Sequence, residues 1–400
     1  MNILVVNSGS SSIKYQFFRM PSTTPVCTGM VDRIGLETST INYKAQINGE
    51  EHAVSLSMEI ADHEAALKEV NTLLMDAKVG VISNPAEIDI VGHRIVHGGE
   101  FFTTTTVITS EVKEKLKQTF QLAPLHNPSA FLGIEVAGKI FDRATQIGVF
   151  DTAFFQTLPA EAYRYAIPTA YYKDYNIRVY GFHGTSHKYV SAQAAAYLNK
   201  SYSRIITVHL GNGCSISAIK NGKAIDTSMG FGPLEGLIMG TRSGSIDPTI
   251  VFYLVNQLGY DIEQVSNLLN KRSGMLGLTG FSDMRDVRAR IQEGDAEAKL
   301  AYDMYAYRIK KYIGAYAAAL NGVDAIVFTA GVGENDALVR KLVCSDLQYL
   351  GVDFDEEKNG LAAKGIREIS SGDSAVKVLI IPTNEELEIA NQCYEMSADR

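Results

Sequence analysis

Short apolar runs alternate with longer amphipathic stretches along this chain. Six runs have the length and composition of buried strands, at 3 to 6, 88 to 96, 146 to 150, 204 to 210, 324 to 329 and 376 to 381. Stretches with helical spacing lie between them, at roughly 59 to 78, 110 to 121, 128 to 142, 187 to 199, 248 to 272, 284 to 320 and 384 to 395. This alternation predicts an α/β fold.

Two local signals refine the pattern. The threonine run at 103 to 106 has the β-branched composition of a plain strand. Asn127 and Pro128 predict a helix start, with asparagine as the cap and proline at the first helical position. The continuity of the pattern is weakest near residue 150, where we expect a domain boundary.

A polar turn follows the first apolar run. Residues 7 to 14 read Asn-Ser-Gly-Ser-Ser-Ser-Ile-Lys, and a second apolar strand follows at 15 to 18. Gly9 allows close approach of the backbone to a ligand, the serines supply hydroxyl donors, and Lys14 adds a positive charge. These features suit a phosphate-binding hairpin, but an ordinary polar turn has the same composition and the Walker pattern is absent.

The combination of an apolar strand and a polar turn recurs later in the chain. The strand at 204 to 210 leads into a glycine-rich turn, a second strand and an Asn-Gly hairpin turn at 221 and 222. A third glycine turn, at 331 to 335, follows an apolar run and precedes a helix-like stretch at 336 to 349. Three such junctions indicate a polyphosphate ligand held from several sides, with helix N-terminal amides at the third.

Composition narrows the function classes. A chain of 400 residues with 46% hydrophobic content favours two domains. The net charge of -8 argues against nonspecific nucleic-acid binding, so an anionic substrate must be captured by local cations. The four cysteines have no short spacing, which indicates a reduced cytoplasmic protein rather than a metal knuckle or disulfide framework. We expect no membrane partner, because no apolar run approaches the ~20 residues of a membrane span.

Two histidine pairs have a spacing of four, which on a helix would suggest zinc. Ile95 between His93 and His97 favours a strand, where residues four apart are separated by about 13 Å. Gly184 interrupts the pair His183 and His187. We therefore expect neither pair to form a metal clamp.

Two arginines, Arg94 and Arg242, lie among small or apolar neighbours where a solvated charge is unexpected. Each could pair with a buried carboxylate or bind a ligand. Together with His183 and Lys14 they favour a phosphoryl site, because the guanidinium fork matches phosphate and carboxylate oxygens.

Acidic residues follow two of the predicted strands. Asp151 ends the strand at 147 to 150, and Glu385 follows the strand at 378 to 382. Carboxylates at strand ends are common magnesium ligands, although helix capping also accounts for Glu385.

These motifs together resemble the acetokinase family, which belongs to the superfamily of actin, sugar kinases and heat-shock chaperone ATPases. The resemblance covers essentially the whole chain, in the segments 7 to 14, 92 to 99, 123 to 128, 149 to 155, 181 to 187, 209 to 213, 226 to 248, 282 to 286, 330 to 335 and 382 to 386. Gly232 and Ser245 depart from the family pattern, where threonine and aspartate are usual.

The resemblance implies reversible, direct in-line phosphoryl transfer between ATP and acetate, giving acetyl phosphate and ADP. It implies four catalytic residues. Arg94 would bind the acetate carboxylate or acetyl phosphate, Arg242 and His183 would stabilise the transferred phosphoryl group, and Asp151 would orient substrate or magnesium. Asn7 and Glu385 would hold Mg²⁺, for which Mn²⁺ is an expected substitute. Residues implied to line the acyl methyl site are Val96, Leu125, Phe182 and Pro233.

The nucleotide side is implied in the same way. Its expected residues are Lys14, His209, Leu210, Gly211, Asn212, Gly213, Asp283, Met284, Arg285, Gly331, Val332, Gly333, Glu334 and Asn335. The family fold has two ribonuclease H-like domains facing across a nucleotide-binding cleft. We expect the first at 1 to 150 plus 386 to 400, and the second, for nucleotide binding and homodimerisation, at 151 to 385.

Two other functions compete with this interpretation. A propionate or butyrate kinase of the same family would use the same chemistry in a roomier pocket, although Val96 favours acetate over larger acids. A nonenzymatic ATP-driven switch or filament is the other. The cations Arg94, His183 and Arg242 argue against a switch, which needs no carboxylate-binding cluster.

Overall fold

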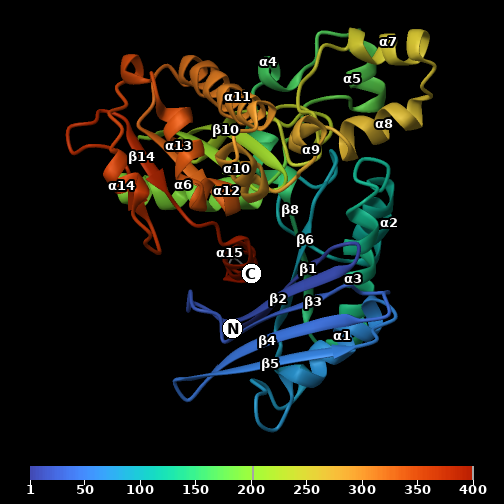
Figure 1. Cartoon of the computed structure of the whole chain (residues 1–400). Coiled ribbons are helices and arrows are strands. Elements are labelled where there is room, and N and C mark those ends of the chain that lie inside the picture. Colours follow the sequence, from blue (N-terminus) through green and yellow to red (C-terminus); the bar gives the residue numbers. More distant parts are fainter. Residues whose placement is uncertain (201, 399–400) are drawn as a thin grey trace. The chain divides into compact units, whose positions relative to one another are not determined.

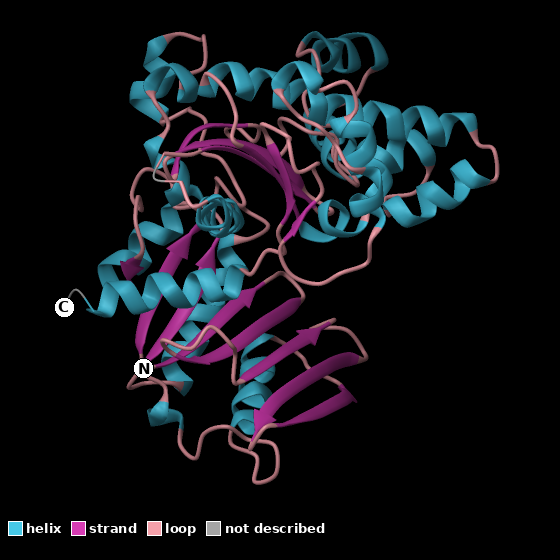
Figure 2. Cartoon of the chain, turned by 90° about the vertical axis from the view of Figure 1, so that its left-hand side faces the viewer, coloured by secondary structure: helices cyan, strands magenta, loops and turns pink. Residues whose placement is uncertain are grey.

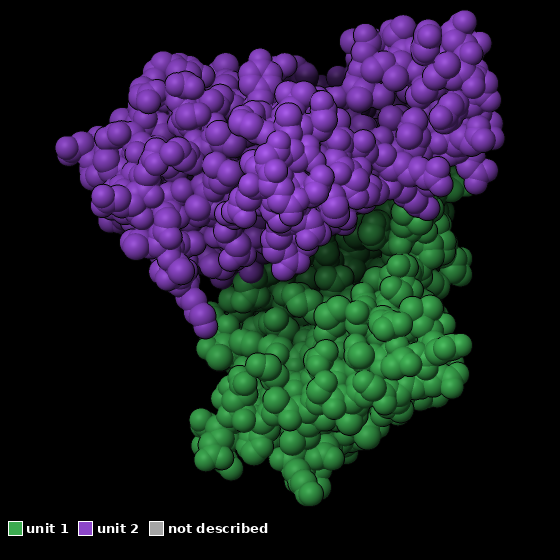
Figure 3. Space-filling view, in the orientation of Figure 1, with its two compact units in different colours: residues 1–154, 384–400 green, residues 155–383 purple. Residues whose placement is uncertain are grey.

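The computed structural model describes residues 1–200 and 202–398, and the chain divides into two compact units (Figure 3). Unit 1 comprises Met1–Phe154 and Asn384–Arg400, and unit 2 comprises Phe155–Thr383. The units divide at 154 and 384, whereas the sequence suggested 150 and 386, so Asp151 and Glu385 both belong to unit 1. No helix in the described part of the chain combines the length and apolar character needed to cross a membrane.

Unit 1 is built on a mixed sheet with the strand order β5-β4-β3-β2-β1-β6-β8-β7 (Figure 1). Its strands are β1 (Asn2–Ser8), β2 (Ser12–Arg19), β3 (Cys27–Asp32), β4 (Ser39–Ile47), β5 (Glu50–Met58), β6 (Ile90–Ile95), β7 (Thr106–Val107) and β8 (Thr145–Phe150). Its helices are α1 (His63–Leu74), α2 (Ser110–Gln118), α3 (Asn127–Ile140) and α15 (Glu385–Ala398).

Successive side chains of β1 point to opposite faces of this sheet, as expected for a strand. Leu4 and Val6 join the core cluster that includes Val136 of α3. On the opposite face, Gly92 of β6 leaves room for α15, because a Cβ there would lie 2.8 Å from the Cys393 sulfur. The return of the chain end to β1 and β6 brings Glu385 to the carboxyl edge of the sheet.

Unit 2 is built on a second sheet with the order β11-β10-β9-β12-β14-β13. Its strands are β9 (Arg204–Leu210), β10 (Cys214–Lys220), β11 (Lys223–Thr227), β12 (Ala325–Thr329), β13 (Arg367–Glu368) and β14 (Lys377–Ile380). Its helices are α4 (Ala160–Tyr163), α5 (Thr169–Tyr175), α6 (Gly184–Leu198), α7 (Thr249–Leu258), α8 (Ile262–Lys271), α9 (Gly274–Thr279), α10 (Met284–Gln292), α11 (Ala296–Leu320), α12 (Ala330–Asn335), α13 (Ala337–Cys344) and α14 (Glu356–Gly360).

Both units repeat one arrangement of five strands, flanked by helices (Figure 2). In unit 1, β1 pairs antiparallel with β2 and parallel with β6, and β6 pairs parallel with β8. In unit 2, β9 pairs antiparallel with β10 and parallel with β12, and β12 pairs parallel with β14. The duplicated α/β fold expected from the sequence is therefore confirmed.

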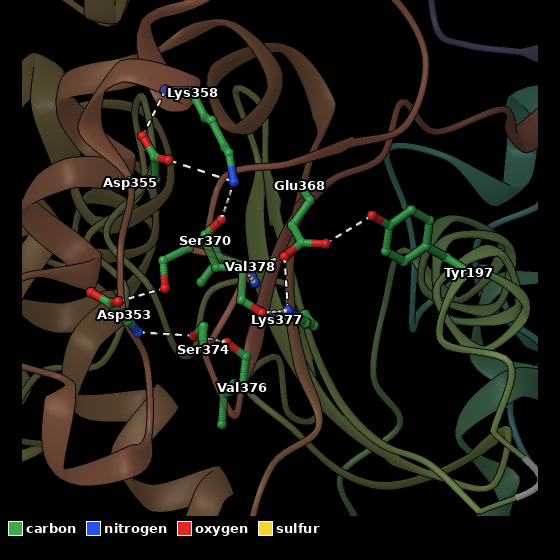
Figure 4. Close-up of polar contacts among 12 residues, drawn as sticks. Tyr197, Asp353, Asp355, Lys358, Glu368, Ser370, Ser374, Val376, Lys377 and Val378 are labelled. Atoms are coloured by element: carbon green, nitrogen blue, oxygen red, sulfur yellow. Dashed lines mark hydrogen bonds and ion pairs between the residues drawn. The ribbon is translucent and has the colours of Figure 1, made fainter.

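Polar contacts join the outer strand of the second sheet to α6 (Figure 4). Glu368 of β13 accepts a hydrogen bond from the Tyr197 hydroxyl of α6 at 2.8 Å. The same carboxylate pairs with Lys377 of β14 at 3.1 Å and accepts a hydrogen bond from Ser370 at 2.9 Å. These contacts fix one end of the helix whose other end carries His183.

Several predicted elements were wrong in detail. Of the threonine run at 103 to 106, only Thr106 belongs to a strand, β7. The strands β3, β4 and β5 were missed, because β5 is largely exposed and carries no apolar run. Two predicted long helices are each divided in two, at Gly259 and at Gly294, which both adopt positive φ angles that favour glycine.

Two predicted turn motifs also differ. The third glycine junction is the short helix α12 rather than an open turn, and the Asn335 side chain bonds the Gly331 carbonyl within it. Asn127 is the first residue of α3 instead of its cap. Its buried amide donates to the His97 carbonyl and to the Thr119 hydroxyl.

Candidate active site

The first group of predicted site residues gathers at the carboxyl edge of the unit 1 sheet. Arg94 is in β6, and Asp151 follows the neighbouring parallel strand β8, so the register of the two strands brings the side chains together. The Arg94 Nη2 and Nε atoms donate to the two Asp151 carboxylate oxygens at 2.8 and 3.3 Å. Arg94 Nη1 lies 3.4 Å from Glu385 Oε2 at the start of α15.

The ionisation of this cluster follows from burial and close charges. Burial by itself would lower the pKa of the Arg94 guanidinium, but Asp151 and Glu385 outweigh it and the pKa is raised. Burial raises the pKa of the Glu385 carboxyl. The Arg94 charge opposes this rise, and the Asp151 charge adds to it. Two of the five Arg94 N–H groups donate hydrogen bonds to Asp151, and Nη1 forms an ion pair with Glu385.

Lys14 and Asn7 lie beside this cluster. Lys14 is inside β2 rather than at the exit of the turn, directly opposite Asn7 of β1. Its ammonium contacts Glu386 Oε1 at 2.7 Å. In the parallel pairing of β1 with β6, Asn7 comes one position after the Val6–His93 pair, which is the level of Arg94. The buried Glu386, which directly follows Glu385 in the sequence, is a further member of this cluster.

The second group of predicted residues gathers in unit 2 around Gly213. A Cβ on Gly213 would lie 3.5 Å from His183 Nε2 and 3.6 Å from Arg242 Nη1, so the two side chains converge on one point. His183 has a left-handed φ of 57° immediately before α6. Its ring stacks on His209, with ring centroids 4.3 Å apart.

The two arginines differ in their partners. Arg94 pairs with carboxylates, which is one of the two alternatives that the sequence left open. Arg242 instead donates to the Pro233 carbonyl at 2.9 Å, and no carboxylate pairs with it within residues 1–200 and 202–398. Burial lowers the pKa of Arg242. A partly buried arginine that has no carboxylate partner among the described residues is suited to bind an anion.

Gly184 begins α6, so His187 lies in the helix, whereas His183 is the left-handed residue immediately before it. The His187 nitrogens take hydroxyl partners, with Nδ1 2.6 Å from Thr207 Oγ1 and Nε2 2.7 Å from Ser215 Oγ. Burial lowers the pKa of His187 well below its usual value. His93 and His97 are also buried, and burial lowers the pKa of each to about 4.

A cavity of about 600 Å³ lies in unit 2 beside the second and third glycine junctions. Of the residues expected at the nucleotide, it is lined by Gly211, Asn212, Asp283, Met284, Arg285, Gly331, Val332 and Asn335. Gly240 and Asn212 can pack closely in the cavity wall only because residue 240 is glycine. A Cβ there would lie 2.1 Å from Asn212 Oδ1. The volume suits a nucleotide-sized ligand.

Comparisons with known proteins assign the chain to one family. The sequence model of the acetokinase family matches residues 2–391. This chain belongs to the acetokinase family.

Relatives within this family are similar over their full lengths. The acetate kinase of Flavobacterium johnsoniae is 55% identical over 99% of both chains, and that of Fervidobacterium nodosum is 54% identical over 99% of this chain and 98% of its own. The crystal structure of Porphyromonas gingivalis acetate kinase gives a TM-score of 0.92 at 46% identity over 99% of both chains. A propionate kinase from Francisella tularensis gives 0.90 at 41% identity over 98% of both.

The remaining residues implied by the acetokinase resemblance are divided between the units. Val96, one residue after β6, and the exposed Leu125 are in unit 1. Phe182 is buried in unit 2, where Pro233 accepts the hydrogen bond from Arg242. His209, Leu210, Gly213, Gly333 and Glu334 belong to the glycine junctions but are not among the residues that line the cavity.

Six cavity residues were not expected from the sequence, namely Gly240, Met275, Ser282, Arg288, Tyr305 and Asp336. Asp336 was hidden because it reads as a helix cap, which it also is, bonding the Val339 amide at 3.2 Å. Its second oxygen accepts from Tyr302 at 2.6 Å. Residues that serve local structure and a site at once give no separate signal in sequence.

Proposed function

We propose that this chain is an acetate kinase, which transfers the terminal phosphoryl group of ATP to acetate reversibly. The observation that carries the proposal is the convergence of His183 Nε2 and Arg242 Nη1 on Gly213, in the unit that also holds the cavity. Acetate is already ionised at neutral pH, so the main obstacle is the mutual repulsion of two anions. Arg242, which is partly buried and has no carboxylate partner among the described residues, meets that requirement.

Each cluster then has a distinct task. The cavity takes the nucleotide, Lys14 binds phosphate, and Arg94 binds the acetate carboxylate. Arg242 and His183 stabilise the equatorial oxygens of the phosphoryl group during direct in-line transfer. Asp151 holds the Arg94 guanidinium in place through two hydrogen bonds. It thereby orients the acceptor.

The donor set in unit 1 suits a magnesium ion. Mg²⁺ prefers oxygen ligands and binds through one or two carboxylates together with substrate phosphates. Glu385 and the Asn7 amide would hold it, and Mn²⁺ would substitute. The ion, when bound, neutralises phosphate charge.

Acetate rather than propionate is the preferred acceptor. The relatives at 54% and 55% identity are acetate kinases, whereas the propionate kinase is 41% identical. Val96 supports the smaller acid if it lines the acyl site. One methylene group is worth only about 1 to 3 kcal/mol of discrimination, so a propionate kinase activity is the second candidate.

The protein is also proposed to be a homodimer that assembles through unit 2, and to act in the cytoplasm, where ATP is available. Helix α7 supports the dimer, because its Phe252 and Tyr253 side chains are 62% and 58% exposed. Ile262 at the start of α8 is 68% exposed. Exposed apolar groups of this kind mark contact surfaces.

A coupled assay of ADP formation tests the proposed function. The purified chain is supplied with ATP, magnesium and acetate, and parallel reactions contain propionate or butyrate at the same concentration. We expect acetate-dependent ADP formation that is abolished by chelating the metal. ADP formation that does not depend on any carboxylic acid would reject the kinase and favour the ATP-driven switch. A higher specificity constant for propionate would favour the second candidate.

A further inference from the structure

A chain of buried hydrogen bonds runs from His183 into the interior of unit 2. His183 Nδ1 lies 2.9 Å from Ser215 Oγ, which lies 2.7 Å from His187 Nε2. His187 Nδ1 lies 2.6 Å from Thr207 Oγ1. Ser215, His187 and Thr207 are completely buried. Bulk water therefore cannot satisfy a missing partner along this relay.

Thr207, at the far end of this relay of hydrogen bonds, determines which atom donates in each of them. Within the described part of the chain, Thr207 Oγ1 makes no hydrogen bond other than the one to His187 Nδ1. A buried hydroxyl proton without an acceptor is costly, so Thr207 donates to His187. His187 is neutral, because burial and the nearby His209 lower its pKa. Its single proton is therefore on Nε2.

The remaining assignments follow in sequence. His187 Nε2–H donates to Ser215, whose own hydroxyl proton then donates to His183 Nδ1. In neutral His183 the ring proton is therefore on Nε2, the atom that lies toward Gly213 and Arg242. The reversed direction would leave the Thr207 proton without an acceptor. The relay thus opposes protonation of His183 at Nδ1.

We propose that Ser215 and Thr207 are positioning residues, acting on His183 directly and through His187, that keep His183 neutral with its proton on Nε2. This inference rests on the proposed function, since it supplies the phosphoryl group with a neutral N–H donor beside the Arg242 cation. A neutral donor stabilises developing phosphate charge without placing a second full cation beside the partly buried Arg242.

Other groups of unit 2 also act on His183. His209 of β9 stacks on its ring, and a Cβ on Gly213 would lie near both the His183 ring and Arg242 Nη1. His209 Nδ1 faces Ser186 Oγ at 2.8 Å, and the Thr383 hydroxyl donates to that same oxygen at 2.9 Å. Arg242 disfavours a second positive charge on His183, so both Arg242 and the relay oppose protonation of His183.

Nitrogen NMR of the full-length protein labelled with ¹⁵N-histidine tests the tautomers directly. We expect both His183 and His187 to carry their protons on Nε2 near neutral pH, with signals assigned by His183→Asn and His187→Gln. In Ser215→Ala, His183 loses its donor at Nδ1, so its protonation midpoint should rise by about one pH unit. Ser217→Ala is the matched control. Ser217 is buried on the same strand but pairs with Thr227 at 2.9 Å.

Kinetics provide the second measurement. Ser215→Ala should lower kcat about tenfold, leave the KM for ATP within about twofold, and move the acid limb of the pH profile to higher pH. Thr207→Val removes only the distal hydroxyl and should shift the same limb by a smaller amount. Thr207→Ser keeps the hydroxyl and should restore the unmodified profile, as should Ser217→Ala.

Each outcome decides a part of the proposal. A His183 spectrum and pH profile in Ser215→Ala identical to those of the unmodified protein would overturn it. If Ser215→Ala does not fold, an identical response of Thr207→Val and Thr207→Ser would overturn it instead. Should the unmodified protein show no acetate-dependent ADP formation, the proposed function fails, while the NMR tautomers still test the relay.

Discussion

Replacing Arg94 with methionine should destabilise unit 1 in a strongly pH-dependent way. Methionine keeps much of the side-chain volume but removes the charge that pairs with Asp151 at 2.8 Å and with Glu385 at 3.4 Å. The Asp151 side chain is 1% exposed and that of Glu385 is 16% exposed. Breaking a buried ion pair from one side costs about 3 to 5 kcal/mol, because a buried charge is left without compensation.

The pH dependence has a definite sign. The folded-state pKa of Glu385 is already raised by burial, and loss of the Arg94 charge raises it further. A carboxyl with a raised folded pKa binds more protons in the folded than in the unfolded state. Stability therefore falls as pH rises from the unfolded pKa of about 4.3 through the folded pKa. The loss in Arg94→Met should be largest at neutral pH and should shrink toward pH of about 5.

Urea unfolding followed by far-ultraviolet circular dichroism, at about pH 5 and about pH 7.5, measures this loss. Arg290→Met is the matched control. Arg290, whose side chain is 46% exposed, pairs with Glu293 at 2.7 Å and with Asp295 at 3.2 Å, and its replacement should cost less than about 1 kcal/mol at either pH. An equal loss at both pH values for Arg94→Met would refute the buried-charge argument, since a packing defect alone does not titrate.

Four further predictions concern activity. Arg242→Ala should lower kcat by about two to three orders of magnitude while nucleotide affinity stays nearly constant, measured by kinetics and nucleotide titration. Val96→Ala should improve propionate over acetate by up to about a hundredfold in the ratio of specificity constants. Glu385→Ala should raise the magnesium concentration needed for half-maximal rate far more than Asn7→Ala, because the carboxylate supplies the charge. Gly213→Ala should fold normally, since its Cβ meets only ordinary contacts of 3.4 Å or more, but should lower kcat by occupying the space between His183 and Arg242.

Each of these has a contrary result. Near-normal turnover in Arg242→Ala would remove Arg242 from the reaction. An unchanged acyl preference in Val96→Ala would place the pocket wall elsewhere. Equal magnesium curves for Glu385→Ala and Asn7→Ala would reject the ligand assignment. Full activity in Gly213→Ala would show that the phosphoryl group does not pass through that point.

The sequence alone determined the repeated framework. Apolar runs located β1, β6, β8, β9, β12 and β14, because a strand buried on both faces leaves a continuous local signal. The same reading located the three glycine junctions. It missed β3 to β5, where exposed and polar positions carry the strands and pairing with neighbours stabilises them.

Only the tertiary structure decided which charged groups meet. Arg94 and Asp151 are 57 positions apart, and they pair because β6 and β8 are neighbouring parallel strands. The sequence left Arg94 and Arg242 with the same two alternatives, and the fold gave carboxylates to one and a backbone carbonyl to the other. The hydrogen-bond relay behind His183 also depends on the tertiary structure. Periodicity is local, whereas an ion pair or a buried hydrogen bond depends on which strands become neighbours, and no local pattern encodes that.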